Sequence, residues 1–454
     1  MKANIFQYIS KLPNTTNYIL LRLNKNPNFI YGNEYKNYKN ILKKSFHEYD
    51  AIPLLLEKVN NAIEKIPYYK KRFSSLKRIQ SIKDFEESMP FIDKDIVLNH
   101  YEEFINPEIN PSDYDRGTTG GTSGKPLKLI MPKRRYIVEM ATMHSLWSSI
   151  GYRFNPRAVI RNHKLDKKKY IINPITREFI FDGFNLNDEY FEIIYRTIKK
   201  FRIRFIHCYP STAYEFSRFL YARKYDTSMI SAFLSGSENI FEYQKALIQN
   251  KLGIRFYNWY GHSEKLILAG YCQTSDIYHI EPTYGYFELI DENGKVIREP
   301  GRFGEMVGTG FHNPAMCFIR YRTGDFAEYV GDYCPDCNRK VSLIRSISGR
   351  WSGNKLYNPD GTFITTTALN LHSDLYEVIE GIQYIQEKKG EVKILIIKSP
   401  LYGERQEKAF YQHFKTKFKP GMAIKIEYVT RLRKLENGKF VHIISTVKEP
   451  GAIE

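Results

Sequence analysis

The stretch Thr118–Pro126, which reads Thr-Thr-Gly-Gly-Thr-Ser-Gly-Lys-Pro, carries the strongest local signal in this sequence. Glycines let a backbone approach a phosphate closely and turn its N–H groups toward it. The hydroxyls of Thr122 and Ser123 can donate to phosphate oxygens, and Lys125 supplies positive charge. The spacing is not the Gly-x-x-x-x-Gly-Lys-Ser/Thr of a P-loop. Residues 116–126 therefore predict a Gly-rich phosphate loop of another kind, with a plain surface loop as the alternative.

Short apolar runs alternate with helical patterns from this loop to about residue 348. The strand-like runs are Ala158–Arg161, Phe205–Cys208, Ala232–Leu234 and Arg255–Asn258, and the helical patterns are Tyr190–Phe201, Thr212–Tyr221 and Glu242–Lys251. Such alternation predicts an α/β domain built on a sheet. Before the loop, residues 1 to about 110 read as helical, and Ser81 reads as the cap of a helix.

The pattern changes twice further along the chain. Gly285–Tyr329 contains the hairpin signal Asp291-Glu292-Asn293-Gly294 and predicts an antiparallel subdomain. After about residue 350 the sequence predicts a compact α+β unit of roughly 100 residues, enough for a domain. Its expected helices are Thr365–Val378 and Glu404–Phe418, and its expected strands are Val392–Ile397, Ile424–Val429 and Phe440–Ser445. We expect a large N-terminal domain over residues 1–348, a hinge at 349–353 and a small C-terminal domain over 354–454.

Composition excludes several classes of protein. The chain has 454 residues, of which 42% are hydrophobic and 26% charged, as in an ordinary globular protein. This rules out a disordered chain, a collagen-like fibre and a disulfide-stapled mini-domain. No apolar run approaches the roughly 20 residues that cross a bilayer, and the N-terminus lacks the apolar stretch of a secretory signal. We expect a cytoplasmic protein with no integral membrane segment.

The net charge of +18 favours contact with polyanions in general. The basic residues are scattered, however, and the sequence is rich in Lys, Asn, Ile and Tyr throughout. The charge therefore reads mainly as solvated surface, and we do not expect nucleic acid to be a partner.

Four further motifs follow the loop in order. They are Asn258–Glu264, which reads Asn-Trp-Tyr-Gly-His-Ser-Glu, then Tyr321–Asp325, Gly349-Arg350 and Gly438-Lys439. Together they resemble the core motifs of the AMP-forming adenylate-forming superfamily of acyl-CoA synthetases, peptide-synthetase adenylation domains and luciferases. Within it, the sequence resembles the phenylacetate–CoA ligase and coenzyme F390 synthetase group, and especially its capsular-polysaccharide-biosynthesis branch. Supporting stretches are Tyr209–Ser211, Ser235–Glu238, Tyr278–Pro282 and Gly304–Gly310.

The resemblance spans roughly residues 85 to 445 and implies a fold. That fold is a large N-terminal domain of several subdomains followed by a small, mobile α+β C-terminal domain. It also implies ATP and Mg²⁺ as cofactors. Implied ATP-binding residues are Thr122, Ser123, Gly124 and Lys125 on the phosphates, Ser237, Glu238, Tyr260 and Gly261 around the adenine, Ser263 on the α-phosphate, Asp325 on the ribose, and Arg350.

Two residues take catalytic roles in this resemblance. Glu264 would ligate Mg²⁺, because a hard dication bridging phosphates prefers carboxylate oxygens. Lys439 would neutralise charge as a carboxylate attacks the α-phosphorus. The sequence departs from the family at the hinge, where Trp351-Ser352-Gly353 contains no Asp, and at His442, where an Arg is usual.

The implied function is that of an AMP-forming ligase, either acid–thiol or acid–amine. It would activate a carboxylic acid as acyl-adenylate and transfer it to an acceptor, with a role in capsule or surface polysaccharide biosynthesis. CoA, an amine and a sugar acceptor all stay open because of the altered hinge. The alternatives are an adenylyl-transferring enzyme of the F390 synthetase type and a retired scaffold that binds polyanions.

A second constellation contains sulfur and imidazole ligands. Cys272, His279 and the pair Cys334 and Cys337 offer four ligands, and tetrahedral structural Zn²⁺ uses such a set. The alternative is a buried cysteine, a surface histidine and an unliganded Cys-x-x-Cys turn. An odd total of five cysteines without a secretory signal argues against disulfides. Separately, Trp147, His163 and His207 are candidates for an acyl pocket or for plain core packing.

Overall fold

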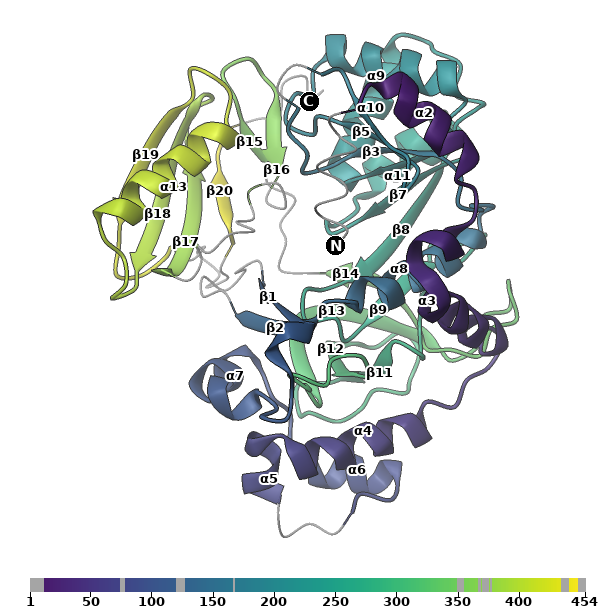
Figure 1. The fold of residues 1–454 in the computed structure, drawn as a ribbon, viewed down its shortest axis with the longest axis vertical. Helices are drawn as coiled ribbons and strands as arrows, with labels where there is room; N and C mark the ends of the chain where they lie inside the picture. The colour runs from purple at the N-terminus through teal and green to yellow at the C-terminus, as the bar shows by residue number, and fades with distance from the viewer. Residues whose placement is uncertain are drawn as a thin grey trace.

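The computed structural model describes residues 12–73, 78–119, 127–165, 168–348, 355–365, 369, 375, 378–433 and 441–447. It has a large part built on one twelve-stranded sheet and a smaller part built on a four-stranded sheet (Figure 1). The predicted α/β fold class is confirmed. None of the described helices is long and apolar enough to cross a membrane.

The N-terminal region is helical, as predicted. Its helices are α2 (Asn14–Leu23), α3 (Pro27–Lys44), α4 (Ile52–Lys65), α5 (Pro67–Phe73), α6 (Ile82–Ser88) and α7 (Lys94–Asn99). Ser81 caps α6 through a reciprocal capping box. The Ser81 hydroxyl accepts from the Asp84 N–H, and the Asp84 carboxylate accepts from the Ser81 N–H, both at 3.1 Å. Two otherwise unpaired donors at the start of the helix are thereby satisfied.

A two-stranded hairpin follows and carries the Gly-rich loop. Its strands are β1 (Tyr114–Thr118) and β2 (Lys128–Pro132), with Thr118 opposite Lys128. Next to the tip, the Thr119 N–H donates to the Leu127 carbonyl at 2.9 Å. The Leu127 N–H in turn donates to the Thr119 hydroxyl at 3.0 Å. These two hydrogen bonds therefore hold the two ends of the loop next to each other.

One half of the large sheet is mostly parallel. Strands β5 (Glu178–Phe181), β3 (Arg157–Ile160), β6 (Phe205–Cys208), β7 (Ala232–Gly236) and β8 (Arg255–Gly261) lie side by side, and antiparallel β4 (Ile171–Asn173) is at the edge. Helices α8 (Arg135–Ser148), α9 (Asp188–Phe201), α10 (Pro210–Ala222) and α11 (Glu242–Lys245) accompany it, and a π-helical turn over Ala246–Lys251 follows α11. The predicted alternation of strands and helices is present. Strand β8 continues three residues beyond its expected end, into the Asn258–Glu264 motif.

The other half of the sheet is antiparallel. It contains β9 (Leu268–Tyr271), β10 (Tyr278–Ile280), β11 (Gly285–Ile290), β12 (Phe303–Gly310), β13 (Tyr321–Gly331) and β14 (Leu343–Ser348). The predicted turn after Ile290 is present, with Gly294 at φ 76° and a bridge from Ile290 to Val296. The expected antiparallel subdomain is nevertheless part of the same sheet, because β8 pairs directly with β9.

The small part has strand order β19 (Ala423–Tyr428), β18 (Glu391–Lys398), β17 (Ile379–Gln386) and β20 (Ile443–Ser445), with α13 (Glu404–Lys417) packed on it. Three of its strands and α13 match predicted elements, whereas β17 was not predicted. Thr365, the start of the predicted helix Thr365–Val378, lies in strand β16. Most of that range is outside the described residues.

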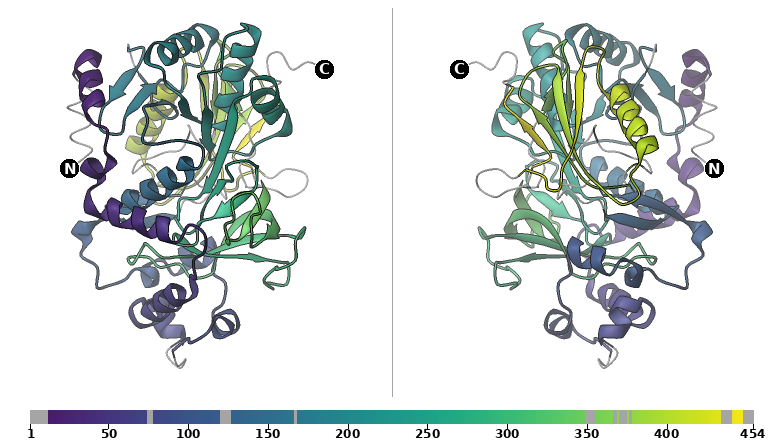
Figure 2. Two further views of the ribbon diagram at one scale, coloured as in Figure 1. Left: turned by 90° about the vertical axis from the view of Figure 1, so that its right-hand side faces the viewer. Right: turned by 90° about the vertical axis from the view of Figure 1, so that its left-hand side faces the viewer.

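A hairpin of β15 (Lys355–Tyr357) and β16 (Phe363–Thr365) lies between the two parts, as Figures 1 and 2 show. Its two faces belong to different cores. Tyr357 and Phe363 pack into the core of the parallel half, whereas Leu356 and Ile364 pack into the core of the small part together with Phe184 of the large part. Apolar side chains therefore join the two parts directly.

Candidate active site

Parallel strands β3, β6, β7 and β8 end at one edge of the large sheet. Their registers place Ile160, Cys208, Ser235 and Asn258 in line, so the residues that follow them share this edge. In open α/β sheets, ligands bind in the crevice at the carboxyl ends of the strands. Three of the stretches named above, Tyr209–Ser211, Ser235–Glu238 and Asn258–Glu264, therefore lie at this edge.

Glu264 follows the end of β8 and is held by two side chains. His262 Nδ1 donates to Glu264 Oε2 at 3.0 Å, and the Tyr321 hydroxyl donates to Oε1 at 3.1 Å. The Ile267 N–H donates to His262 Nε2 at 3.2 Å, which assigns the proton of a neutral imidazole to Nδ1. Burial raises the pKa of Glu264, but the hydrogen bond from His262 and smaller neighbouring interactions together outweigh burial, and the pKa is about 2. An ionised carboxylate at neutral pH is the form that would hold Mg²⁺.

Tyr260 and Asp325 come from β8 and β13 and contact each other. The Tyr260 hydroxyl donates to Asp325 Oδ2 at 2.8 Å. Burial, followed by the charge of Asp325, raises the pKa of Tyr260 well above its ordinary value. Asp325 is placed by a tight turn in which its N–H donates to the Thr323 hydroxyl and the Gly324 N–H donates to Glu305. Gly324 has a φ of 70°, a backbone conformation that glycine adopts without strain.

Ser237 and Glu238 leave β7 with strained geometry. Ser237 has a φ of 71°, which is uncommon for a residue other than glycine and occurs at functional sites. Glu238 is half-buried; its Oε2 accepts from the Ser211 N–H at 3.0 Å, at the start of α10. Its Oε1 has no hydrogen-bond partner among the described residues. Burial raises the pKa of this carboxyl. A buried acceptor without a partner is costly unless a ligand supplies a donor.

Ser263 and Gly261 also lie at this edge. Ser263 is half-buried in the turn after β8. Gly261 is opposite Leu268 in the β8–β9 ladder, where a Cβ would come within 3.1 Å of the Trp259 ring. The backbone here therefore fits only a small residue without shifting Leu268 or Trp259.

Arg161 is a residue at this edge that sequence reasoning did not select. Its guanidinium donates to His207 Nε2 at 2.8 Å and to the Ser237 hydroxyl at 3.2 Å, and lies 4.4 Å above the Tyr209 ring. Within the described ranges it has no carboxylate partner, whereas buried Arg157, Arg320 and Arg339 each pair with a glutamate. Its position directly after a parallel strand was the available signal.

Several predicted residues lie outside the described residues. They are Thr122, Ser123, Gly124 and Lys125 of the loop, Arg350 beside the hinge, and Lys439. The ends of the segment that carries Lys439 are described, however. Buried Gln383 donates through Nε2 to the carbonyls of Arg433 and Val441 at 2.9 and 2.8 Å, and its Oε1 accepts from the Arg433 N–H at 2.8 Å. One amide side chain thus joins both ends of residues 434–440.

Cys272, His279, Cys334 and Cys337 come together in a second site. Their ligand atoms all lie within 4.8 Å of one another. Cys272 Sγ is 3.8 Å from Cys334 Sγ, and Cys337 Sγ is 3.9 Å from His279 Nδ1. Tetrahedral zinc with Zn–S bonds of about 2.3 Å would hold two sulfur atoms about 3.8 Å apart. The set therefore fits a closed zinc site in number, chemistry and spacing.

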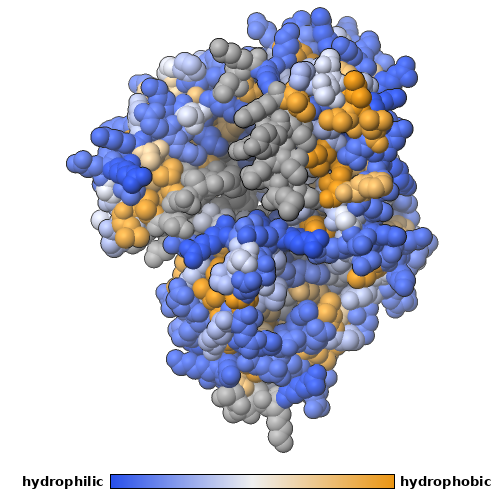
Figure 3. Space-filling model, in the orientation of Figure 1, coloured by the Kyte–Doolittle hydropathy of each residue, from blue (hydrophilic) through white to orange (hydrophobic). Residues whose placement is uncertain are grey.

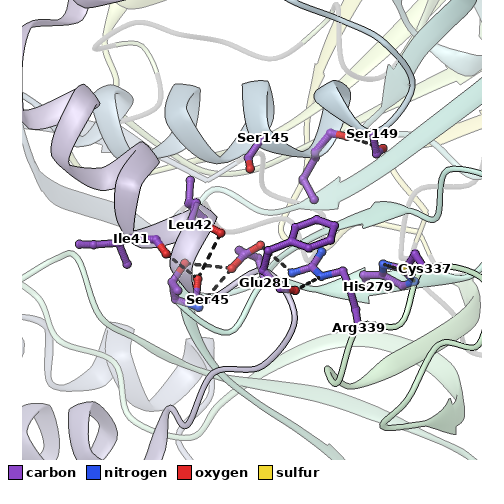
Figure 4. A network of polar contacts seen from close by, with 12 residues as sticks. Ile41, Leu42, Ser45, Ser145, Ser149, His279, Glu281, Cys337 and Arg339 are labelled. Carbon is purple, nitrogen blue, oxygen red and sulfur yellow. Dashed lines mark hydrogen bonds and ion pairs between the residues drawn. The ribbon is translucent and has the colours of Figure 1, made fainter.

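One buried ion pair, between Arg339 and Glu281, lies beside His279 and Cys337, as Figure 4 shows. Arg339 lies beside His279 and Cys337 and donates to Glu281 at 3.3 Å and to the Phe46 carbonyl at 2.8 Å. Burial, followed by the charge of Arg339, lowers the pKa of His279 to about 4, so its imidazole is neutral at physiological pH. Neutral imidazole is the form that binds a metal.

Comparison with known proteins decides the fold family. The chain resembles solved structures of 2-hydroxyisobutyryl-CoA ligase at 14% identity. In the postadenylation state with an acyl-AMP, the match covers 87% of this chain and 88% of that chain with a TM-score of 0.54. With 2-HIB-AMP and CoA in the thioesterification state, the coverage is the same and the TM-score is 0.53. The chain has the adenylate-forming fold.

The C-terminal part adds a second finding. Residues 356–446 match the family model of the CapK C-terminal domain. An open conformation of the same CoA ligase matches with a TM-score of 0.50, over 86% of this chain and 90% of that one. No curated protein sequence matches the chain significantly. The predicted likeness to adenylate-forming enzymes is therefore confirmed for the fold, and residues 356–446 agree with the predicted likeness to the capsule branch.

Proposed function

We propose that this protein is an ATP-dependent, AMP-forming ligase that activates a carboxylic acid as an acyl-adenylate. The observation that carries the proposal is the meeting of Glu264, Tyr260 and Asp325 at the carboxyl edge of the parallel strands. Tyr260 and Glu264 come from the end of β8 and the turn after it, and Asp325 comes from β13, far away in sequence. In a protein with the adenylate-forming fold, we expect ATP to bind at this edge. The adenylating activity is inferred from the fold, and the roles of individual residues are inferred from their positions at this edge.

The first half-reaction joins the acid to AMP. A carboxylate oxygen attacks the α-phosphorus of ATP, the bond from that phosphorus to the bridging oxygen breaks, and pyrophosphate leaves. Lys439 places an ammonium beside the charge that develops on the α-phosphate, which is electrostatic stabilisation. Ionised Glu264 holds Mg²⁺, which would neutralise phosphate charge when bound.

The remaining residues position the nucleotide and the acid. Asp325 accepts from the ribose hydroxyls while Tyr260, fixed by its hydrogen bond to Asp325, stacks on the adenine. The unpartnered oxygen of Glu238 is suited to accept from the adenine amino group. Arg161, with no carboxylate partner among the described residues, is placed to bind the substrate carboxylate. Loop residues Thr122–Lys125 hold the β- and γ-phosphates.

The second half-reaction transfers the acyl group to an acceptor. CoA is the acceptor to test first, because solved structures of the same fold contain acyl-AMP and CoA together. The match of residues 356–446 to the CapK C-terminal domain supports a role in assembly of a capsule or another surface polysaccharide. That role favours a sugar amine as the second acceptor to test. Residues 349–353 are the proposed hinge for the domain movement between the two steps.

We further propose that the Cys272, His279, Cys334 and Cys337 cluster binds structural Zn²⁺. The ligands come from the β9–β10 pair and from the loop before β14, so the ion would join three segments of the antiparallel half. Four protein ligands leave no position for a substrate, which suits a structural site.

Hydroxylamine trapping tests the ligase proposal. Purified protein, ATP, Mg²⁺ and pools of aromatic, fatty, amino and uronic acids are incubated with hydroxylamine, and hydroxamates and pyrophosphate are measured. The proposal predicts a hydroxamate from one acid class, lost in Lys439→Ala. A stable AMP adduct without hydroxamate would favour an enzyme of the F390 synthetase type. No ATP binding by calorimetry would favour a retired scaffold.

A further inference from the structure

Helix α2 carries apolar side chains on its outward side as well as on the side that faces the protein. The side that contacts the protein carries Asn14, Asn17 and Leu21, while the opposite side carries Ile19, Leu20 and Leu23. Asn14 bonds the backbone of β4 and its flank, and Asn24 donates to the carbonyls of Pro174 and Ile175. A surface helix of a globular protein normally has its apolar stripe facing the core and polar residues on its outward side.

The outward apolar side chains are strongly exposed. Leu23 is 76% exposed, Ile19 61% and Leu20 40%, and Phe29, in the first turn of the next helix α3, is 88% exposed. At 100° per residue, Ile19, Leu20 and Leu23 fall on one stripe of the helix. Figure 3 shows this hydrophobic surface over α2, surrounded by hydrophilic residues. With Leu12 and Ile41, residues 12–41 supply six of the fourteen large hydrophobic side chains that are exposed in the described part of the chain.

The charge of this region has one sign. Residues 1–33 contain Lys2, Lys11, Arg22 and Lys25 and no acidic residue, although 50 of the 454 residues in the chain are acidic. Arg22 and Lys25 are exposed and flank the apolar stripe. Their long side chains can keep the charge in water while the neighbouring apolar groups are buried. A cationic rim around an exposed apolar stripe is the pattern of a helix that lies in a membrane interface.

We propose that α2 and Phe29 dock this protein on the surface of a membrane that contains anionic lipid. The helix has ten residues, too few to span a bilayer, so it would lie in the plane of the headgroups. Leu23, Ile19 and Phe29 enter the acyl boundary, and Arg22 and Lys25 contact the lipid phosphates. The inference is independent of the ligase proposal, because none of these residues is at the carboxyl edge of the sheet.

Vesicle binding by the full-length protein tests this inference. The protein is mixed with vesicles of phosphatidylcholine alone or of phosphatidylcholine with phosphatidylglycerol, and the bound fraction is measured by flotation. We expect binding to the anionic vesicles that falls as salt is raised. Arg22→Gln with Lys25→Gln should weaken it by roughly tenfold or more, at about 1 kcal/mol for each charge near the surface. Ile19→Ser with Leu23→Ser should abolish it.

A matched control separates this patch from hydrophobicity in general. Phe303 and Leu401 are 56% and 70% exposed and lie far from α2 in the sequence, so Phe303→Ser with Leu401→Ser should bind as the wild type does. Circular dichroism melts confirm that every variant is folded. Absent or lipid-independent binding of the wild type would overturn the inference, and so would unchanged binding of the Ile19→Ser, Leu23→Ser variant. A dimer in solution that Leu23→Ser disrupts would identify a second copy of the chain as the occupant instead.

Discussion

At the scale of single residues, we propose different roles for two charged residues of the site, Asp325 and Arg161. Asp325 is fixed by the hydrogen bond from Tyr260 and by that to Thr323, whereas among the described residues Arg161 donates to His207 and Ser237 and to no carboxylate. In our proposal Asp325 binds the nucleotide and Arg161 binds the carboxylic acid. The two roles can be separated, because each substrate has its own KM.

We expect Asp325→Asn and Arg161→Gln to affect different substrates. Asp325→Asn removes a charged acceptor and should raise the KM for ATP about tenfold to a hundredfold, since hydrogen bonds to charged groups contribute about 1.5–3 kcal/mol. Arg161→Gln should raise the KM for the acid and leave that for ATP nearly unchanged. Steady-state kinetics with each substrate varied in turn measures both. Equal effects of the two variants on both constants would contradict the assignment.

Buried His144 predicts a pH dependence of stability. Its Nδ1 lies 2.8 Å from the Tyr35 hydroxyl, and burial, followed by the charges of Arg157 and Lys39, lowers its pKa well below the ordinary 6.5. Well above pH 6.5, His144 is neutral in both the folded and the unfolded state. As the pH falls below it, only the unfolded state takes up the proton, so stability is lost by up to about 1.4 kcal/mol per pH unit.

Urea unfolding at pH 7.5 and at pH 5.5 measures this loss. We expect His144→Gln to be less stable than the wild type at pH 7.5. On acidification, its free energy of unfolding should fall by less than that of the wild type. The difference in free energy of unfolding between the two proteins should therefore be smaller at pH 5.5. A difference that is constant or larger at the lower pH would show that His144 does not titrate as proposed.

At the scale of elements, strand β17 holds the segment that carries Lys439. Gln383 bonds both ends of residues 434–440, and Gln386, three residues along the same strand, bonds the backbone of Tyr357 and Glu391. Both glutamines are fully buried. They form a matched pair: among the described contacts, Gln383 bonds the two residues that flank 434–440, Arg433 and Val441, and Gln386 bonds neither of them.

Gln383→Leu should lower kcat for adenylation by tenfold or more, whereas Gln386→Leu should leave it within about twofold. Both substitutions remove buried hydrogen bonds and should cost similar stability, about 1–3 kcal/mol. Chemical denaturation gives the stability and pyrophosphate release gives kcat. If activity in the two variants follows stability alone, Gln383 has no positioning role.

The elements show where sequence reasoning succeeds. The parallel strands and their helices were predicted because their apolar runs are short, buried on both faces and separated by amphipathic helices. Strand β17 was missed because Gln383 and Gln386 interrupt its apolar pattern. Most of the partners that satisfy their buried amides are 29 to 58 residues away, and local sequence does not show those partners.

The site shows the same limit. The motifs selected Tyr260 and Asp325 through their resemblance to a family, and the structure places these two side chains in contact, while the roles of the residues stay proposals. They did not predict Arg161, since a lone arginine after a strand is distinguishable only once the positions of all carboxylates are known. The proposed zinc ligands were chosen by residue type, and the structure shows that the pairing of β9 with β10 brings Cys272 and His279 close together.

At the scale of the whole molecule, zinc would stabilise one half of the large sheet. We expect about one equivalent of zinc in protein purified without chelator. Cys334→Ser with Cys337→Ser should lose that metal and lower the melting temperature, while Cys208→Ser, a buried cysteine in β6, should keep it. Elemental analysis and thermal melts measure both quantities. Protein that contains no zinc and melts unchanged after the double substitution would contradict the structural role.

Adenylation itself is the central claim, and hydroxamate formation from a carboxylic acid tests it most directly. The account predicts a hydroxamate and stoichiometric pyrophosphate that require ATP and Mg²⁺ and that are lost in both Lys439→Ala and Glu264→Gln. Glu264→Gln preserves the shape of the side chain and removes the charge that would hold Mg²⁺. Hydroxamate formed at the wild-type rate by both variants, or ATP bound without turnover of any acid class, would contradict the account.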